Sequence, residues 1–373
     1  MDMKSSGNFR IPAEWEPHEA VWLAWPYDKI SFGSLNRRNH EFDPGLLPRV
    51  EQRFAEIIAE LAKGERVDIL IRDLSRPPAT LPPGLAKRSG AGTPGEGNNI
   101  RFHEVDYADV WTRDYTPSFV IQDLIPAPSF ARRGSKIQAV KWEYDAYSKK
   151  FPDLLKDNEI FNPSLSPLNL RGDEGGLLRE IEILKPGIVM EGGAIEVNGQ
   201  GILLTTEQCL LKRNPNLSKR DIEKVFEAYL GIKKVIWLKQ GIVNDHTDGH
   251  IDELAKFVAP NKIVCAFEED SNDPNYQVLS QAFEVLKIFF EVIKLPMPHL
   301  TYHNGQKAPA SYVNFFIANK VVLVPTFGDP NDDNALEIIG KQFPERDILG
   351  IDSTEIIYGG GAIHCATREQ PAA

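Results

Sequence analysis

The chain repeats one local pattern, an amphipathic helix followed by a short apolar strand, and this pattern restricts its fold more than any other feature. The first helical face consists of apolar residues three or four positions apart: Val50, Phe54, Ile57, Ile58 and Leu61. Gly64 follows at a position suited to ending a helix. The apolar segment 67–71 comes next and predicts a strand.

A second unit of the same kind begins at Ser218, which forms a helix-start signal with Asp221. The apolar face of this helix consists of Ile222, Val225, Phe226, Tyr229 and Leu230. Gly231 predicts the helix end, and segment 235–238 predicts the next strand. Segments 276–286 and 335–343 also predict helices, whereas 262–267 and 321–324 predict strands. The fold class is therefore α/β throughout.

Length and charge limit the classes of function. The 373 residues are 42% hydrophobic, enough to bury a substantial core, and no literal internal repeat is visible. The net charge is −11 and basic residues form no runs, which argues against a nucleic-acid partner. No apolar stretch approaches the length of a membrane span, and residues 1–10 lack the apolar core of a leader. With three cysteines and no disulfide framework, we expect a cytoplasmic protein.

Two segments predict loops instead of helices or strands. Segment 76–98 is crowded with proline and glycine, and segment 162–176 is rich in proline, serine and glycine. Each lies upstream of a motif described below, so each could shape or cover the entrance to a site. The alternative, which we favour, is a solvated insertion.

Cys365 is the best candidate for a nucleophile. It follows the glycine run 359–361, where the backbone can turn tightly and approach a ligand closely. Cys209 and Cys265 lie within apolar runs and are typical of core residues. The alternative for Cys365 is a buried thiol without a chemical role.

A histidine and an orienting carboxylate usually accompany a nucleophilic thiol. Segment 245–252 contains two histidines and three aspartates. It could bind a metal, form a solvated turn, or supply His250 as a general acid/base with Asp252 beside it. In extended chain, His250 and Asp252 would face the same way. No second cluster of this kind stands out to complete a metal site, which argues against a metal.

Two further segments contain single carboxylates in distinctive surroundings. In segment 109–117, Asp114 follows Trp111 and Arg113 and precedes a proline that disfavours helix. In segment 189–197, Glu191 lies between an apolar run and a Gly-Gly pair. The alternatives are a surface salt bridge beside a packed tryptophan and an ordinary strand bulge.

Together these motifs resemble the guanidine-modifying enzymes, and most closely the agmatine deiminases and bacterial-type peptidylarginine deiminases. The matching segments cover nearly the whole chain: 12–18, 22–26, 111–114, 191–193, 247–252, 327–330 and 359–365. The resemblance implies an α/β propeller of five ββαβ-type modules around a pseudo-fivefold axis, the pentein fold, with the site in the central channel. The motifs span the chain, so we expect a single catalytic domain, residues 1–373.

The resemblance also implies a role for each site residue. Cys365 would be the nucleophile, His250 the acid/base, and Glu191 the carboxylate that orients His250. The substrate-binding residues would be Asp114 and Asp252, which hold the guanidinium, and Trp111. The chemistry of the family needs neither a metal nor an organic cofactor. The chain departs from the family pattern at Thr116, where glycine is usual, and at Ala362, where a polar residue is usual.

The expected reaction is hydrolysis of a small cationic guanidine substrate through a covalent thiouronium on Cys365. Agmatine is favoured, giving N-carbamoylputrescine and ammonia, because free arginine would require a basic residue facing its carboxylate. Arg113 is the only basic residue within a catalytic motif. Because it directly precedes Asp114, its side chain would point away from the substrate in an extended chain. The alternatives are a peptidylarginine or free-arginine deiminase, an amidinotransferase, and a non-catalytic binding module. Homo-oligomerisation is left open.

Overall fold

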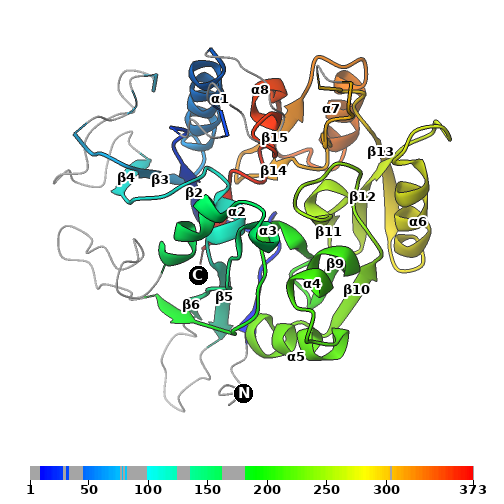
Figure 1. Cartoon of the computed structure of the whole chain (residues 1–373), viewed down its shortest axis with the longest axis horizontal. Helices are drawn as coiled ribbons and strands as arrows, with labels where there is room; N and C mark the ends of the chain where they lie inside the picture. The colour runs from blue at the N-terminus through cyan, green and yellow to red at the C-terminus, as the bar shows by residue number, and fades with distance from the viewer. Residues whose placement is uncertain are drawn as a thin grey trace.

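Five small sheets surround a common centre, as Figure 1 shows in a view of the computed structural model. The structure describes residues 9–27, 31–32, 45–75, 78, 80–81, 99–123, 135–161, 181–302 and 305–372. Within these ranges each sheet has three or four strands. The short helix α2 (Thr112–Tyr115) lies near the middle of the view. The α/β class and the five-module propeller are thereby confirmed.

Three of the sheets show the repeating unit in its simplest form: two antiparallel strands, a helical connection, and a third strand parallel to the second. The first consists of β8 (Ile195–Val197), β9 (Ile202–Thr206), α4 (Glu207–Arg213), α5 (Lys219–Leu230) and β10 (Lys234–Leu238). The second consists of β11 (Ala255–Ala259), β12 (Lys262–Phe267), α6 (Tyr276–Leu286) and β13 (Glu291–Pro296). The third consists of β14 (Phe316–Ile317), β15 (Val321–Thr326), α7 (Asp332–Gly340) and β16 (Asp347–Asp352).

The other two sheets carry an additional strand. One contains β5 (Ser118–Asp123), β6 (Ser135–Val140) and β7 (Glu182–Leu184), with β1 (Phe9–Arg10) on the edge; α3 (Ala146–Lys149) and η1 (Pro152–Glu159) lie between β6 and β7. The last contains β17 (Arg368–Pro371), β2 (His18–Ala24), β3 (Arg66–Ile71) and β4 (Ile100–Glu104), with α1 (Leu46–Leu61) between β2 and β3. Because β17 pairs antiparallel with β2, placing Arg368 opposite Trp22, the two ends of the chain complete one module.

The middle strands β12 and β15 are buried along most of their length, which explains their composition. In β12 the residues from Ile263 to Ala266 are all buried, and in β15 the first five residues are buried. A strand covered on both faces is continuously apolar instead of alternating. The helices α1, α5, α6 and α7 lie on the outside of the ring in Figure 1, and their apolar faces cover the sheets.

Most elements expected from the sequence are present. The helix 276–286 and the strand 262–267 have the predicted bounds, and α7 begins at Asp332, three residues before the predicted start. Helix α5 begins with the predicted capping box of Ser218 and Asp221, and it ends at Gly231 in the left-handed conformation. Helix α1 ends at Leu61 with Ala62 as its C-cap, so Gly64 lies beyond the cap. The expectation that Gly64 ends this helix is therefore wrong.

Two expectations fall largely on residues that the structure does not describe. All of segment 162–176 and nearly all of segment 76–98 lie outside the described residues. In the described part of the chain, no helix is both long enough and apolar enough to cross a bilayer.

The end of α5 generates a stability prediction. Gly231 has φ +70°, and a Cβ there would lie 1.8 Å from the carbonyl oxygen of Phe9 in β1. Gly231→Ala therefore adds a backbone clash to the cost of left-handed strain, which is about 1–2 kcal/mol. We expect a lower free energy of unfolding in urea denaturation. The matched control is Gly187→Ala, since Gly187 has φ +75° with nothing within 4 Å of its added Cβ. Equal losses in the two variants would contradict the proposed clash.

Candidate active site

The predicted site residues occupy equivalent places in their modules, just before the first strand of each sheet. Asp114 lies in α2 before β5, Glu191 precedes the 3-10 turn η3 (Gly192–Ala194) before β8, His250 precedes the turn η4 (Ile251–Glu253) before β11, and Cys365 precedes β17. The turn η3 contacts both α2 and η4. The pseudo-symmetry of the fold thus brings residues from distant parts of the chain to one centre.

His250 lies between three carboxylates. Its Nε2 is 3.6 Å from Glu191 Oε2, and its Nδ1 is 3.8 Å from Asp114 Oδ1 and 4.0 Å from Asp252 Oδ1. Neither ring nitrogen has a hydrogen-bond partner among the described residues, although the ring is buried. Burial lowers the pKa of His250, but the charge of Asp114 and the contacts with Cys209 and Glu191 outweigh it, and the pKa is raised well above its usual value. The ring is therefore positively charged at neutral pH.

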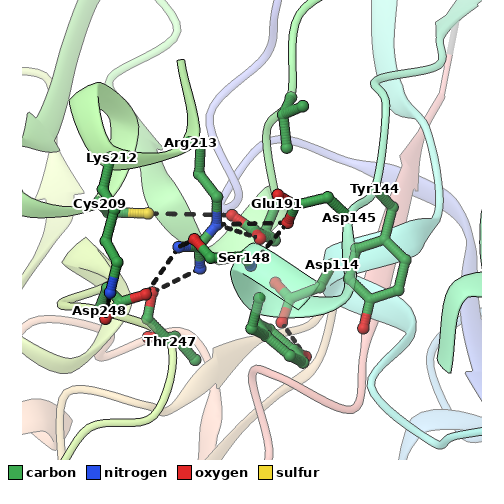
Figure 2. A network of polar contacts seen from close by, with 12 residues as sticks. Asp114, Tyr144, Asp145, Ser148, Glu191, Cys209, Lys212, Arg213, Thr247 and Asp248 are labelled. Carbon is green, nitrogen blue, oxygen red and sulfur yellow. Dashed lines mark hydrogen bonds and ion pairs between the residues drawn. The ribbon is translucent and has the colours of Figure 1, made fainter. Parts of the chain in front are cut away.

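Glu191 is held by an arginine from helix α4. Arg213 Nε lies 2.6 Å from Glu191 Oε1, and both side chains are fully buried. Figure 2 shows that the same guanidinium also reaches Ser148, Asp248 and Thr247. Burial raises the pKa of Glu191, but contacts with His250 and Arg213 outweigh it and lower the pKa. Glu191 is therefore a fixed, ionised partner for His250.

The segment Ala146–Lys149 turns in the left-handed sense, with φ between 56° and 60° at all four residues. None of these residues is glycine, and each left-handed residue costs about 1–2 kcal/mol. The turn is held by contacts into the site, since Tyr147 donates to Asp114 Oδ2 at 2.8 Å and Ser148 Oγ accepts from Arg213. Such strain persists where the surroundings determine the conformation, and it concentrates at functional sites.

The two aspartates approach each other across Gly193. Asp114 Oδ1 accepts from the Gly193 N–H at 3.0 Å. A Cβ at Gly193 would lie 2.5 Å from His250 Nδ1, 2.9 Å from Asp252 Oδ2 and 3.1 Å from Asp114 Oδ1. Glycine is therefore required here, because a side chain would occupy the space where these three groups converge.

Asp114 and Asp252 differ in their ionisation. Burial, Asp252 and Glu191 raise the pKa of Asp114 despite the nearby His250. Burial also raises the pKa of Asp252, but the hydrogen bond and positive charge of His364 outweigh it, so the pKa is lowered. Asp114 thus needs a cation nearby to stabilise its charge, whereas the surroundings of Asp252 already stabilise its ionised form.

Cys365 lies against the same group of acids. Its Sγ is 3.2 Å from Asn314 Nδ2 and 3.6 Å from Asp252 Oδ2. Burial raises the pKa of this thiol, and the negative charges of Asp252, Glu253 and Asp114 raise it further, to well above the usual value. In the free protein the thiol is therefore protonated at neutral pH.

The glycine run before Cys365 packs against Trp111 instead of leaving open space. A Cβ at Gly361 would lie 2.8 Å from Trp111 Cζ3, and one at Gly359 would lie 2.3 Å from Phe32. The Trp111 ring is buried and lies beside Phe32, with ring centroids 6.1 Å apart. The predicted substrate-contacting tryptophan is thus next to the predicted nucleophile.

All six residues predicted for the site, Cys365, His250, Glu191, Asp114, Asp252 and Trp111, gather at this centre. The expectation that Asp252 and Arg113 lie in extended chain was wrong. Asp252 lies in a 3-10 turn, not in extended chain two residues from His250. Arg113 lies in the helix α2, which ends at Tyr115 with Thr116 as its C-cap before the proline. Its guanidinium nevertheless points to Glu14 and Glu369 and not to the carboxylates predicted to bind the guanidinium of the substrate.

Sequence reasoning missed three side chains at the site: Asn314, Arg213 and Tyr147. Asn314 precedes β14, the place in its module that corresponds to those of the other site residues, and only this symmetry could have identified it. Cys209 is buried as predicted, but its Sγ lies 3.9 Å from Glu191 Oε2, so it borders the site. Of the two departures from the family pattern, Thr116 donates to the Thr112 carbonyl in α2 and Ala362 is buried.

Metal binding at this centre remains a competing interpretation. Glu191, Cys209 and His250 offer ligand atoms within 4.8 Å of one another, as do Asp252, Glu253 and Cys365. Glu191 has no histidine near it in the sequence, which argued against a metal site. In the structure, however, His250 Nε2 lies 3.6 Å from Glu191 Oε2. The first cluster suits a metal poorly, because Arg213 already occupies Glu191 and would repel a second cation.

Comparisons with known proteins extend over the whole chain. An agmatine deiminase from Pseudomonas syringae is 34% identical over 395 residues, covering 98% of this chain and 96% of the relative. The solved agmatine deiminase of Enterococcus faecalis is 29% identical with a TM-score of 0.74, covering 99% of this chain and 98% of that one. The C. jejuni agmatine deiminase with substrate bound has the same fold, with a TM-score of 0.77 at 24% identity over 98% of this chain and 97% of that one.

A family model covers residues 10–371, and therefore all of the site described above. The chain belongs to the Porphyromonas-type peptidyl-arginine deiminase family.

Proposed function

We propose that this protein is an agmatine deiminase, which converts agmatine and water to N-carbamoylputrescine and ammonia. The observation that carries the proposal is the position of Asp114 and Asp252, two carboxylates that approach the same nitrogen of His250, Nδ1, with Asp252 next to the Cys365 thiol. The full-length similarity to agmatine deiminases supports the same reaction.

The two aspartates suit a planar cation. A guanidinium presents pairs of N–H groups that a carboxylate accepts by charge-assisted, bidentate bonds. Asp252 Oδ1 has no hydrogen-bond partner among the described residues, and Asp114 carries a raised pKa that a cation would lower. A bound guanidinium would supply what both groups need, and it would present its central carbon to Cys365.

Substrate binding would also activate the thiol. The acids around Cys365 raise its pKa, so the free thiol is a weak nucleophile. A guanidinium between Asp114 and Asp252 neutralises that negative field, and the charged His250 acts in the same direction. The thiol proton leaves to solvent, and the thiolate forms in the complex with substrate.

In the first half-reaction, the Cys365 thiolate attacks the guanidinium carbon and forms a C–S bond. His250 gives its proton to the departing amino nitrogen, the C–N bond breaks, and ammonia leaves. A cationic S-alkylthiouronium on Cys365 and a neutral His250 remain. Glu191, fixed by Arg213, orients the ring and stabilises its charged form.

In the second half-reaction, neutral His250 takes a proton from water as the oxygen attacks the thiouronium carbon. The C–S bond then breaks, and its electron pair returns to the Cys365 thiolate. The hydroxyl proton of the product passes to the released ammonia, giving ammonium and a neutral ureido product. Every bonding step uses side chains of this chain, the substrate and water.

The basic residues near the site favour a substrate without a carboxylate. Arg113 pairs with Glu14 and Glu369, and Arg213 pairs with Glu191 and Asp248. Neither arginine is available for the α-carboxylate of free arginine. These ion pairs support agmatine as the substrate. The earlier reason, that Arg113 lies in extended chain, was wrong, because Arg113 lies in α2.

The proposal treats residues 1–373 as one catalytic domain, since the site draws on every module. The cysteines Cys209, Cys265 and Cys365 are all free thiols, which suits a reducing cytoplasm. Oligomeric state stays open.

Ammonia release from agmatine, free arginine and a blocked arginyl peptide, offered separately, tests the substrate. We expect release from agmatine, and we expect Cys365→Ala to reduce kcat by at least about 10³-fold, because the covalent step is lost. Cys265→Ala is the matched control: Cys265 is buried in β12 outside the site, and its loss should leave turnover in place.

Each other outcome of this assay has a distinct meaning. Release from the peptide alone would assign the protein-modifying reaction, and release from free arginine alone would overturn the argument from Arg113. Ammonia release by Cys365→Ala would overturn the covalent mechanism. Turnover that requires an acceptor amine and releases little ammonia would identify an amidinotransferase, and no turnover with any substrate would favour a binding module.

The raised pKa of Cys365 predicts the ionisation of the free protein. A thiol with a raised pKa stays protonated through neutral pH and ionises only above the usual value of about 8.5. We therefore expect no Cys365 thiolate at pH 7 in the difference between the 240 nm titrations of wild type and Cys365→Ser. A thiolate signal already present at pH 6 would contradict substrate-dependent activation.

The metal interpretation predicts a different result from the proposed mechanism after chelation. Since the proposed steps use side chains alone, dialysis against EDTA should leave ammonia release from agmatine unchanged. Loss of activity that returns on adding zinc or manganese would instead assign one of the two clusters around Glu191 or Cys365 to a metal.

A further inference from the structure

Two residues of the matching motifs, Glu14 and His364, have no part in the proposed chemistry but are in contact beside the site. His364 Nδ1 lies 2.8 Å from Asp252 Oδ2, and His364 Nε2 lies 2.9 Å from Glu14 Oε2. All three side chains are buried. They form a continuous chain of hydrogen bonds from Glu14 to the predicted guanidinium-binding carboxylate.

Each nitrogen of the His364 ring contacts a buried acid. Burial raises the pKa of Glu14, but Lys256 and His364 outweigh it and the pKa is lowered well below its usual value. The pKa of Asp252 is also lowered. Both acids are therefore ionised, and an ionised carboxylate can only accept a hydrogen bond from the ring.

Glu14 itself cannot rotate. Its Oε1 accepts from Lys256 Nζ and from the Ile317 N–H, each at 2.9 Å. Its Oε2 accepts from Arg113 at 3.3 Å as well as from His364. Groups from three other segments therefore fix the carboxylate that anchors the His364 ring.

The backbone of His364 is also held in place. Its N–H donates to the side-chain carbonyl of Asn314 at 3.0 Å, and its carbonyl accepts from Arg113 Nε at 3.3 Å. The backbone from which the ring extends is therefore held in place, and both ring nitrogens have hydrogen-bond partners. Such a side chain can position a neighbour because its own rotamer is determined.

The two carboxylate oxygens of Asp252 have different contacts. Oδ2 meets His364 at 2.8 Å and the Cys365 thiol at 3.6 Å. Oδ1 has no hydrogen-bond partner among the described residues and faces His250 at 4.0 Å. One oxygen is anchored, and the other is left to receive a ligand.

We propose that His364, held between Glu14 and Asp252, is a positioning residue that orients the Asp252 carboxylate for binding the guanidinium of the substrate. This inference rests on the proposed deiminase function. His364 touches neither the reacting carbon nor the leaving group, and it acts on the substrate only through Asp252.

The ionisation of Asp252 also depends on its other charged and titratable neighbours. These are His250, Lys256, Arg113, Cys365, Glu253 and Asp114. His364 Nδ1 lies 2.8 Å from Asp252 Oδ2, whereas Cys365 Sγ lies 3.6 Å from that oxygen and His250 Nδ1 lies 4.0 Å from Oδ1. Removal of His364 should therefore raise the pKa of Asp252, and the acid limb of 1/KM should move to higher pH.

Two substitutions separate the contacts of the ring. The amide nitrogen of His364→Asn can take the place of Nδ1 and still donate to Asp252. That of His364→Gln reaches the place of Nε2, so it keeps the contact with Glu14 and loses Asp252. We expect His364→Gln to raise the KM for agmatine about 10- to 100-fold, with a smaller effect on kcat, since a hydrogen bond to a charged group is lost. His364→Asn should raise KM less.

The matched control is His103→Asn. His103 lies on strand β4, outside the site, and its Nε2 is 2.8 Å from the buried Asp68 of strand β3. This variant breaks a histidine–carboxylate contact of the same length, so it should lower the thermal midpoint without changing KM or its pH profile. Circular dichroism and thermal unfolding check that each variant folds.

Equal KM values for wild type and His364→Gln, or an unshifted acid limb, would overturn the proposal. So would equal effects of the Gln and Asn variants on KM. If His364→Gln does not fold, His364→Asn decides alone: because it loses the contact with Glu14, it must still raise KM above the wild-type value. Calorimetric binding of agmatine to Cys365→Ser, with and without His364→Gln, tests the positioning role without turnover. If wild type releases no ammonia, the proposed function fails, while this binding comparison still decides the role of His364.

Discussion

The buried carboxylate of Glu14 is the interaction on which the centre of the molecule depends. It lies just before β2, and it accepts hydrogen bonds from α2, β11, β14 and the turn before β17. Removing one partner of a buried ion pair typically costs about 3–5 kcal/mol, because the other charge is left uncompensated. A single side chain therefore joins four segments that are far apart in the sequence, and it does so where the active-site turns meet.

The site itself is an arrangement of negative charge that is only partly neutralised. Arg213 compensates the charge of Glu191, and His364 forms a hydrogen bond with Asp252, but Asp114 and the Cys365 thiol both have raised pKa values. A cationic substrate therefore completes the electrostatics of the site and does not merely fill its space. The same property gives selectivity for charge, since a neutral urea product lacks the interaction that favoured binding of the guanidinium.

The sequence predicted the elements with strong local signals, such as the capped helix α5 and the apolar strand β12. It also predicted six site residues from motifs that resemble a known family, and the structure brings these six together. What it could not predict depends on contacts between modules: Arg213 on Glu191, and Asn314 on Cys365. Local geometry also misled where tight turns replace extended chain, as between His250 and Asp252. A 3-10 turn of three residues carries no periodicity that a sequence pattern could reveal.

The pairing of β17 with β2 has a consequence for biosynthesis. Trp22 emerges from the ribosome long before its partner Arg368. During translation one edge of β2 lacks its neighbour, and an unpaired strand edge is prone to wrong association. Cys365 lies three residues before β17, so its thiol reaches its acidic surroundings only as the ring closes. A chain that stopped before Cys365 would therefore lack both the closed ring and the predicted nucleophile.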